Sequence, residues 1–164
     1  MRRFPIYAVL FLILPAAWPA SHRALLPRVQ RIQYGAGRFT LDRAAVSVAS
    51  GAGTEEQFAA AELGRWLGVP VRPGARGKII RLERTGSLPA LPEADEKPGP
   101  EGRESYRIAV TPDAVTITAP SAAGLYYGAQ TLRQMVEDGA LPEAQIHDWP
   151  HMAYRGFMMD LSHG

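Results

Sequence analysis

The stretch "ESYRIAVTPDAVTITAP", residues 104–120, decides the fold because it predicts the most regular β-hairpin in the chain. Apolar side chains alternate with polar ones on both sides of the turn sequence "TPDA". The alternating positions are Tyr106, Ile108, Val110, Val115 and Ile117. Pro112 fixes a backbone angle suited to a turn, and the Asp113 side chain can bond its own backbone. Two antiparallel strands are therefore expected here.

The next residues, "SAAGLYYGAQTLRQMVEDG" (121–139), predict an amphipathic helix that begins at Ser121 and ends at Gly139. Serine is a favourable N-cap, and glycine commonly follows a helix C-terminus. One apolar stripe recurs at helical spacing. It consists of Leu125, Ala129, Leu132 and Val136. Gly124 and Gly128 flatten the neighbouring face, so the helix can lie close to a sheet.

The residues before this stretch predict shorter strands. In "LLPRVQRIQYGAGRFTLD", residues 25–42, apolar residues alternate on either side of Gly35 and Gly37, which indicates another hairpin. Single strands are predicted at residues 44–50 and 78–84.

A second helix is predicted between those two strands. Thr54, with Gln57 three residues later, fits a capping box, and Gly68 with Pro70 ends the helix. Apolar residues widen one face, and Trp66 among them is expected in the core. They include Phe58, Ala61, Leu63, Trp66 and Leu67.

Pro, Gly and acidic residues without periodicity make residues 85–104 a solvated surface loop. After the last predicted helix, "IHDWP" (146–150) reads as a short connecting strand or linker, and Pro150 marks a boundary. The fold class expected up to this point is α+β, a small sheet with two helices packed on it.

Composition is that of an ordinary globular protein. Of the 164 residues, 46% are hydrophobic and 21% are charged. The net charge is +2, and no basic or acidic run is long enough for a nucleic-acid surface, so a neutral or weakly charged partner is favoured. The chain has no cysteine, which excludes disulfides, thiol nucleophiles and thiolate metal sites.

The first 23 residues have the layout of a secretory signal peptide. Arg2 and Arg3 precede the uncharged run "FPIYAVLFLIL", residues 4–14, which is followed by Pro and small residues. A membrane span needs about 20 residues, more than this run offers. We expect cleavage between Ala17 and Ala24, no membrane attachment afterwards, and a periplasmic or secreted bacterial protein. An uncleaved N-terminal anchor is the alternative.

Common catalytic motifs are absent from the sequence. It contains no Gly-x-Ser-x-Gly, no His-Glu-x-x-His and no phosphate-binding glycine-rich pattern. His147 and His151 are four residues apart, which on a helix suggests a metal, but Pro150 between them denies the helix. We therefore expect neither a metal nor a cofactor.

The closing stretch, "AYRGFMMDLSHG" (153–164), predicts a strand unlike the others. Residues Tyr154 to Leu161 are nearly all apolar on both faces, which is typical of strands in parallel sheets and (β/α) barrels. We therefore expect the α+β domain to be followed by an orphan first strand of a (β/α)8 barrel.

Three stretches resemble the family 20 glycoside hydrolases, the β-N-acetylhexosaminidases. "HDWPHMAYRGFMMD" resembles the entry into that family's catalytic barrel. "LLPRVQRIQYGAGRFTL" resembles the opening of its small α/β domain, and "SAAGLYYGAQTLRQM" its last helix, with a Gly-x-x-x-Gly-x-x-Thr-Leu-x-Gln pattern. With the signal peptide at 1–23, the chain then divides into a hexosaminidase-type domain at 24–147 and the start of a truncated barrel at 148–164.

The resemblance implies release of terminal N-acetylhexosamine with retention, the substrate's own acetamido oxygen acting as nucleophile. The family's Asp-Glu pair, in which Asp orients the acetamido group and Glu is the general acid, is expected downstream of Gly164. The chain is therefore expected to be an inactive N-terminal fragment that carries no catalytic residue. Its expected partners are a glycan ending in N-acetylhexosamine and the missing C-terminal barrel of the same protein.

The resemblance also assigns roles to two residues. Arg155 matches the arginine that opens the first barrel strand and binds sugar hydroxyls, for which a guanidinium offers several fixed donors. The alternative is a strand-edge arginine paired with Asp148 or Asp160. Asp160 is expected to fix a neighbouring Arg or His. Trp149, Tyr154 and the apolar residues 157–159 are expected to pack in the core or at a domain interface.

The sequence departs from the family after Asp160, where "LSHG" omits the usual Arg and aromatic residue. That departure allows a different sugar preference. Two other interpretations stay open. The chain is the leading domain of another exported carbohydrase, such as an α-glucuronidase or an O-GlcNAcase-like protein, or it is a non-catalytic secreted module that binds a glycan or a protein.

Overall fold

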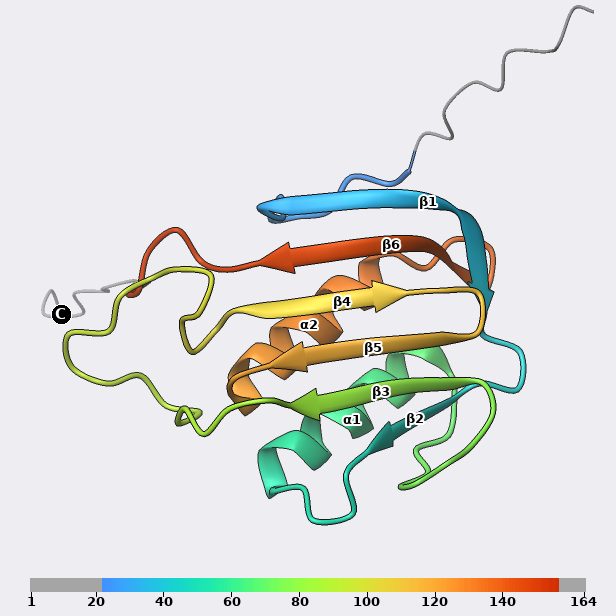
Figure 1. The fold of residues 1–164 in the computed structure, drawn as a ribbon, viewed down its shortest axis with the longest axis horizontal. Helices are drawn as coiled ribbons and strands as arrows, with labels where there is room; N and C mark the ends of the chain where they lie inside the picture. Colours follow the sequence, from blue (N-terminus) through green and yellow to red (C-terminus); the bar gives the residue numbers. More distant parts are fainter. Residues whose placement is uncertain (1–21, 157–164) are drawn as a thin grey trace, which may run out of the picture.

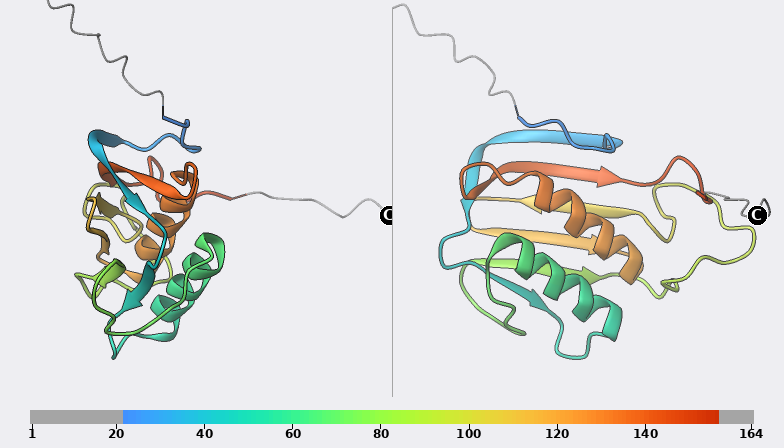
Figure 2. Two further views of the ribbon diagram at one scale, coloured as in Figure 1. Left: turned by 90° about the vertical axis from the view of Figure 1, so that its right-hand side faces the viewer. Right: turned by 180° about the vertical axis from the view of Figure 1, so that it is seen from behind.

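The computed structural model describes residues 22–156, in which six strands form a mixed sheet and two helices cover one of its faces (Figure 1). The strand order is β1-β6-β4-β5-β3-β2. The strands are β1 Arg31–Thr40, β2 Ala45–Val48, β3 Ile79–Arg84, β4 Tyr106–Val110, β5 Ala114–Ala119 and β6 Ala140–Asp148. The helices are α1 Thr54–Leu67 and α2 Ala122–Gln134. Both helices lie on the same side of the sheet in the turned views (Figure 2), which confirms the predicted α+β fold.

β4 and β5 form the predicted hairpin. They pair antiparallel from Arg107 opposite Thr118 to Val110 opposite Val115. On one side of the hairpin, β3 runs parallel to β5 and β2 runs parallel to β3. On the other side, β6 runs antiparallel to both β4 and β1. The hairpin therefore joins a parallel half of the sheet to an antiparallel half.

The first predicted hairpin is wrong, because the chain continues in one strand through Gly35 and Gly37. This strand, β1, pairs with β6 and has a bulge between Tyr34 and Arg38. The Gly37 amide donates a hydrogen bond to the Glu143 carboxylate of β6 at 2.8 Å. The glycines therefore shape a bulge rather than a turn.

β6 is longer than the short connecting strand or linker expected from the sequence. It follows a tight turn at Asp138 and Gly139, where φ is positive at 50° and 71°. Glu137 and Ala140 on either side of this turn exchange backbone hydrogen bonds of 2.8 and 3.0 Å. Pro142 argues against a strand in the sequence, because proline cannot donate a hydrogen bond to a β-ladder. In the structure it lies beside the bulge of β1.

α1 begins at Thr54 and ends before Gly68, as predicted, but its cap and its packing differ from the prediction. The N-cap is Gly53 rather than Thr54, and the Glu56 carboxylate, not Gln57, accepts the Gly53 amide hydrogen bond. Phe58, expected on the apolar face, is 57% exposed. Small side chains face the core because α1 lies close to its neighbours. The buried residues are Glu56, Ala59, Ala60, Leu63 and Gly64.

α2 begins at the predicted N-cap, where the Ser121 hydroxyl accepts a hydrogen bond from the Gly124 amide at 3.1 Å. Leu125, Ala129 and Leu132 of the predicted stripe are 0% exposed. The helix ends at Gln134, before the predicted glycine. A Cβ added to Gly128 would lie 2.6 Å from Ile117 Cγ2, so the predicted close approach of helix and sheet is confirmed.

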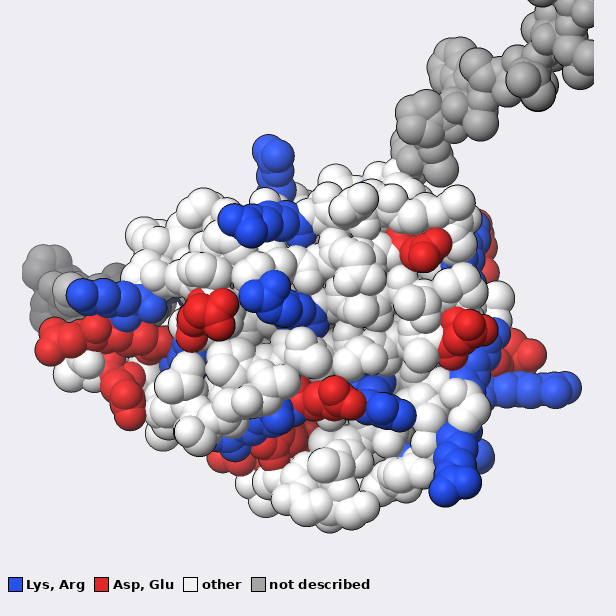
Figure 3. All heavy atoms as spheres, in the orientation of Figure 1, with Lys and Arg blue, Asp and Glu red and all other residues white. Residues whose placement is uncertain are grey.

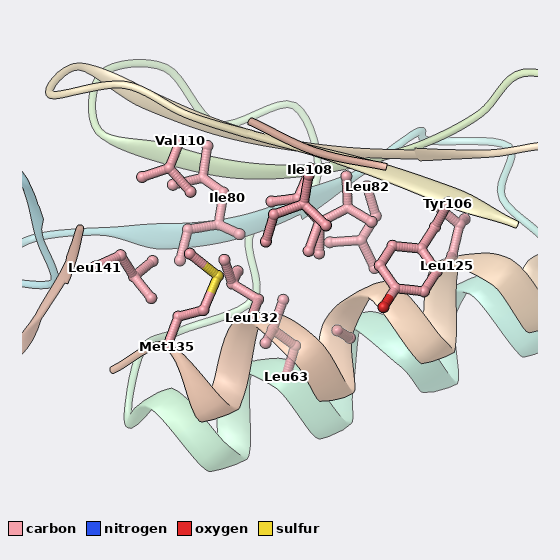
Figure 4. Close-up of a cluster of buried hydrophobic side chains, with 14 of the residues drawn as sticks. Leu63, Ile80, Leu82, Tyr106, Ile108, Val110, Leu125, Leu132, Met135 and Leu141 are labelled. Atoms are coloured by element: carbon pink, nitrogen blue, oxygen red, sulfur yellow. The ribbon is translucent and has the colours of Figure 1, made fainter. Parts of the chain in front are cut away.

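The core lies between the sheet and the helices (Figure 4). Aliphatic side chains of β3 and β4 point toward leucines of α1 and α2. Each fully buried aliphatic side chain contributes about 1.5–3 kcal/mol to folding. The labelled members include Ile80, Leu82, Ile108, Val110, Leu63, Leu125 and Leu132. Tyr106 lies at the end of this cluster, where its hydroxyl meets the site described below.

Two predicted segments lie largely outside the described residues. Residues 1–21 hold most of the predicted signal peptide, and residues 157–164 hold Asp160 and most of the predicted barrel strand. Tyr154 to Gly156, where that strand would begin, have no regular secondary structure. Residues 85–104 contain neither helix nor strand, as predicted. No helix within residues 22–156 has the length and apolar character needed to cross a membrane.

Candidate functional site

The chain leaves the domain beside a cavity of about 360 Å³, which we call the exit cavity. Its walls come from the residues before β1, the start of β4, one side of α2 and the segment after β6. The polar and aromatic lining includes Glu104, Tyr106, Tyr127, Asp148, Trp149 and Arg155. Because Arg155 is one of the two residues assigned a role from the sequence, the exit cavity is the candidate site.

A buried hydroxyl network closes the inner wall of the exit cavity. The Tyr106 hydroxyl donates to Asp148 Oδ2 at 2.6 Å and lies 2.6 Å from Thr131 Oγ1 of α2. Asp148 Oδ1 also accepts a hydrogen bond from the backbone amide of Gln30 at 2.9 Å. Burial, and then the hydrogen bond to Asp148, raise the pKa of Tyr106 above its ordinary value. The network joins the entry of the domain, its last strand and α2.

Arg155 reaches back to the domain and forms an ion pair with Glu104, the residue that precedes Ser105 and β4. Its Nη1 donates to the Met152 carbonyl at 3.1 Å. The hydrogen bond to Glu104 raises the pKa of Arg155. Of the pairings foreseen from the sequence, the one with Asp148 is wrong, because the ion pair of Arg155 is with Glu104. Asp160 lies outside the described residues, and the contact of Arg155 with a sugar stays a prediction.

The two histidines near the exit, His147 and His151, have different partners. Trp149 packs edge-on against His147 with 4.8 Å between ring centroids, and the Arg31 guanidinium lies 5.2 Å from the Trp149 ring. His147 Nε2 contacts the Pro100 carbonyl at 3.2 Å. His151 Nε2 instead lies 2.9 Å from Gln30 Nε2. The two histidines therefore do not converge on a shared ligand position.

Trp66 and Tyr154 differ in how far they match the packing expected from the sequence. Trp66 is partly buried against the core, and the Arg133 guanidinium covers its ring at 5.0 Å. Tyr154 is 59% exposed, and its hydroxyl donates to the Glu93 carbonyl at 2.6 Å.

The carboxylates around the exit cavity are engaged by the domain itself. Asp148 accepts from Tyr106, and each oxygen of Glu104 accepts from an arginine. Asp95 and Glu96 are adjacent acids in the loop, but Glu96 accepts hydrogen bonds from Arg103 Nε at 3.0 and 3.1 Å. These contacts link the loop, β4 and the residues after β6.

Sequence reasoning missed Arg103, Glu104 and Tyr106 as members of the site. The two charged residues end a stretch assigned to solvent, yet each is 8% exposed. Tyr106 was assigned to the core from its alternation, and its hydroxyl partners lie far away in the sequence. The only signal in the sequence for this part of the site is the dipeptide Arg103-Glu104, which directly precedes a predicted strand.

The sheet face that the helices leave uncovered carries no large region of one charge (Figure 3). Lys and Arg are interspersed with Asp and Glu there, and uncharged side chains fill most of the visible area.

Comparison with known proteins agrees with this architecture. The family model "Glycosyl hydrolase family 20, domain 2" matches residues 22–149. A β-N-acetylhexosaminidase from Cellulomonas fimi is 37% identical over 114 residues, covering 64% of this chain and 21% of that protein. A solved family 20 β-N-acetylglucosaminidase is 32% identical with a TM-score of 0.59, covering 85% of this chain and 25% of that one. The family 20 β-N-acetylhexosaminidase from Streptomyces coelicolor A3(2) is 25% identical with a TM-score of 0.56, covering 80% and 27%.

These matches define a domain of glycoside hydrolases, with a fold that the solved family 20 structures share. The chain belongs to glycosyl hydrolase family 20, and residues 22–149 form the domain that the family model calls domain 2. The chain spans about a fifth of the length of the curated relative from Cellulomonas fimi.

Proposed function

We propose that this chain is the leading, non-catalytic part of an exported β-N-acetylhexosaminidase. The match of residues 22–149 to domain 2 of family 20 is the observation that carries the proposal. The relatives are a β-N-acetylhexosaminidase and a β-N-acetylglucosaminidase, which supports a glycan with a terminal N-acetylhexosamine as substrate. The signal-like residues 1–23 support export to the periplasm or the medium.

The reaction proposed for the whole enzyme is hydrolysis with retention, in which the acetamido oxygen of the substrate acts as nucleophile. That scheme needs an acid to protonate the leaving oxygen and a second carboxylate to orient the acetamido group. The acids at the exit cavity are held by Tyr106, Arg103 and Arg155 and do not offer such a pair. The 164-residue chain is therefore proposed to lack turnover.

An assay of the purified chain on a chromogenic N-acetylglucosaminide tests the proposal. We expect no hydrolysis above that of a heat-denatured sample. The Asp148→Asn variant, purified in parallel, serves as a control for contaminating host enzyme, since a contaminant would be equally active in both preparations. Sustained hydrolysis by the chain, reduced in the variant, contradicts the proposal.

The gene offers an independent test of the whole-enzyme assignment. Sequencing past codon 164 is expected to continue into a barrel with an adjacent Asp-Glu pair at the end of a later strand. The product of that longer frame should hydrolyse the same N-acetylglucosaminide. A stop codon directly after Gly164 would contradict the proposal and favour a free-standing module that binds a glycan or a protein.

A further inference from the structure

One corner of the sheet face that the helices leave uncovered gathers arginine and glutamine side chains from distant parts of the sequence. Arg31 of β1 lies opposite His147 of β6, and His147 lies opposite Arg107 of β4. Gln33 lies opposite Gln145 in the next row. Residues two apart in a strand share one face of the sheet, so all of these side chains lie together. We call this set the arginine face: Arg31, Gln33, Arg107, Gln145 and His147.

The arginine face points away from the helices. Ile108 and Ile146, which alternate with its members along β4 and β6, are buried in the core. Its members are exposed, apart from the partly buried His147. In Figure 3, basic side chains stand in the upper left part of this sheet face, over the beginnings of β1 and β4.

The charge around the arginine face is locally positive. Its members line a cavity of about 1090 Å³ together with the start of the domain, which adds Arg23 and Arg28. The lining contains no aspartate or glutamate within residues 22–156. One acid contacts the arginine face from the loop: Glu101 accepts a hydrogen bond from Arg107 at 3.5 Å, and its side chain is 86% exposed. So exposed a pair adds little stability, and a ligand can replace the acid.

An aromatic ring holds one of the two arginines. The Arg31 guanidinium lies 5.2 Å from the centre of the Trp149 ring, and Trp149 packs edge-on against His147. A guanidinium stacked on a ring keeps its planar set of N–H donors, which can bind a carboxylate through two parallel hydrogen bonds. Arg31 is therefore arranged in advance for an acidic ligand.

The spacing of the charges indicates the class of ligand. Arg31 and Arg107 are two strands apart, so their backbones are separated by about 10 Å. The neighbouring amides of Gln33 and Gln145 both donate and accept hydrogen bonds, as sugar hydroxyl groups require. A nucleic acid carries a phosphate at every nucleotide and would place some phosphates against these uncharged amides. Separate carboxylates joined by hydroxyl-bearing sugars fit the arginine face better.

We propose that the arginine face is a non-catalytic binding site for an acidic oligosaccharide, one whose sugars carry carboxylate groups. Arg31 and Arg107 bind the carboxylates, and Gln33 and Gln145 bind hydroxyl groups near them. The site is built from β1, β4 and β6 alone, so it is independent of the hydrolase activity proposed above.

Equilibrium dialysis of the full 164-residue chain against end-labelled hexagalacturonate tests the proposal. We expect binding that weakens as salt is added, because salt screens exposed charges. Arg31→Gln and Arg107→Gln should each lower the affinity about tenfold, since each removes a hydrogen bond between charged groups. Glu101→Gln removes the competing acid and should raise the affinity about twofold, a gain that misfolding cannot produce.

Arg81→Gln is the matched control. Arg81 is exposed between the buried Ile80 and Leu82 of β3, so it lies on the same face of the sheet, where it pairs with Glu83 at 3.4 Å. The variant loses the same charge as Arg31→Gln but at a distance from the arginine face. It should bind hexagalacturonate within about twofold of the wild type.

Two further ligands separate an acidic glycan from its alternatives. N-acetylchitohexaose is the neutral counterpart, and a thymidine hexanucleotide is the phosphate-bearing one. Both should bind at least about tenfold more weakly than hexagalacturonate, because neither places carboxylates on the two arginines. Equal affinity for either ligand, or hexagalacturonate binding that Arg31→Gln and Arg107→Gln leave unchanged, would overturn the proposal. So would the absence of binding at about 1 mM hexagalacturonate.

Discussion

The Tyr106 hydroxyl lies between Thr131 and Asp148, at 2.6 Å from each. Changing Tyr106 to Phe keeps the ring in the core but removes the hydrogen bond to a half-buried carboxylate. We expect the free energy of unfolding to fall by about 1–3 kcal/mol, because Asp148 then loses a donor that water replaces poorly. Urea denaturation at neutral pH measures it, and a change below about 0.5 kcal/mol would show that the contact adds little.

The same residue predicts a loss of stability in alkali. Burial and the hydrogen bond to Asp148 raise the pKa of Tyr106 above its ordinary 10.0, so the folded protein keeps a proton that the unfolded chain releases. This contribution is complete below pH 10.0 and declines above it, by up to about 1.4 kcal/mol per pH unit. Tyr106→Phe should therefore show a shallower alkaline decline than the wild type in denaturation series on both sides of that pH. Parallel declines would contradict the assignment.

Gly124 lets α2 lie against the loop and β5. A Cβ there would lie 2.3 Å from the Ser105 carbonyl oxygen and 2.8 Å from Ala119 Cβ, and neither is a flexible side-chain end. Gly124→Ala gains up to about 1 kcal/mol of helix propensity but is expected to lose about 1–3 kcal/mol net through displacement of the helix. Gly51→Ala is the control, because nothing lies within 4 Å of the added Cβ. Equal stabilities of the two variants in urea would refute the close approach.

At the residue scale, the sequence predicts what depends on near neighbours. Ser121 as N-cap and Gly124 as a contact point both follow from spacing along one helix. The pairing of Glu104 does not, because its partner Arg155 is distant in the chain and lies after four further elements. For that reason the sequence could name Arg155 but not the residue it binds.

At the element scale, α1 is attached to β3 through its first turn. Glu56 accepts a hydrogen bond from the Gly53 amide and another from Arg84 Nη1 at 3.0 Å, and its side chain is 8% exposed. Glu56→Ala should lower the free energy of unfolding by about 2 kcal/mol, combining the loss of a cap with an unpaired Arg84. Glu55→Ala, one position earlier and exposed, should cost about 0.3–1 kcal/mol through the helix dipole alone. Similar losses for both would mean that Glu56 acts only by its charge.

The elements also show where periodicity stops being informative. The β4–β5 hairpin was predicted because its turn and both strands are contiguous. β1 was misassigned since Gly35 and Gly37 are compatible with a turn or a bulge, and only the partner strand decides between them. That partner, β6, comes from the other end of the domain and contains Pro142, which argues against a strand in any local reading of the sequence.

For the whole molecule, the family assignment was more robust than any single element. Three short stretches in the family's order predicted the domain, although the first of them was given the wrong secondary structure. The order of these stretches is informative because the first and last strands of the domain, β1 and β6, pair with each other. The contacts within this domain do not determine sugar preference or catalytic geometry.

The contacts at the start of the domain also predict where the proposed signal peptide would be cleaved. Residues 22–30 already belong to the domain. The Arg23 amide donates to Glu137 Oε1 at 3.0 Å, the Leu26 amide donates to Gln134 Oε1 at 2.9 Å, and Leu25 is 9% exposed. Cleavage after Ala24 would put a charged ammonium group on a buried leucine and remove the contact of Arg23.

If the signal peptide proposed above is removed, we therefore expect the remaining chain to begin at or before His22, with Trp18 or Ser21 as the first residue when cleavage follows Ala17 or Ala20. N-terminal sequencing of the exported form measures this directly. A recombinant chain beginning at His22 should unfold at the same urea concentration as the exported form. A chain beginning at Arg31 should be less stable by about 3–5 kcal/mol, because it lacks the buried side chains of Leu25 and Val29. Recovery of a processed form that begins at Leu25 would show that the contact of Arg23 is dispensable.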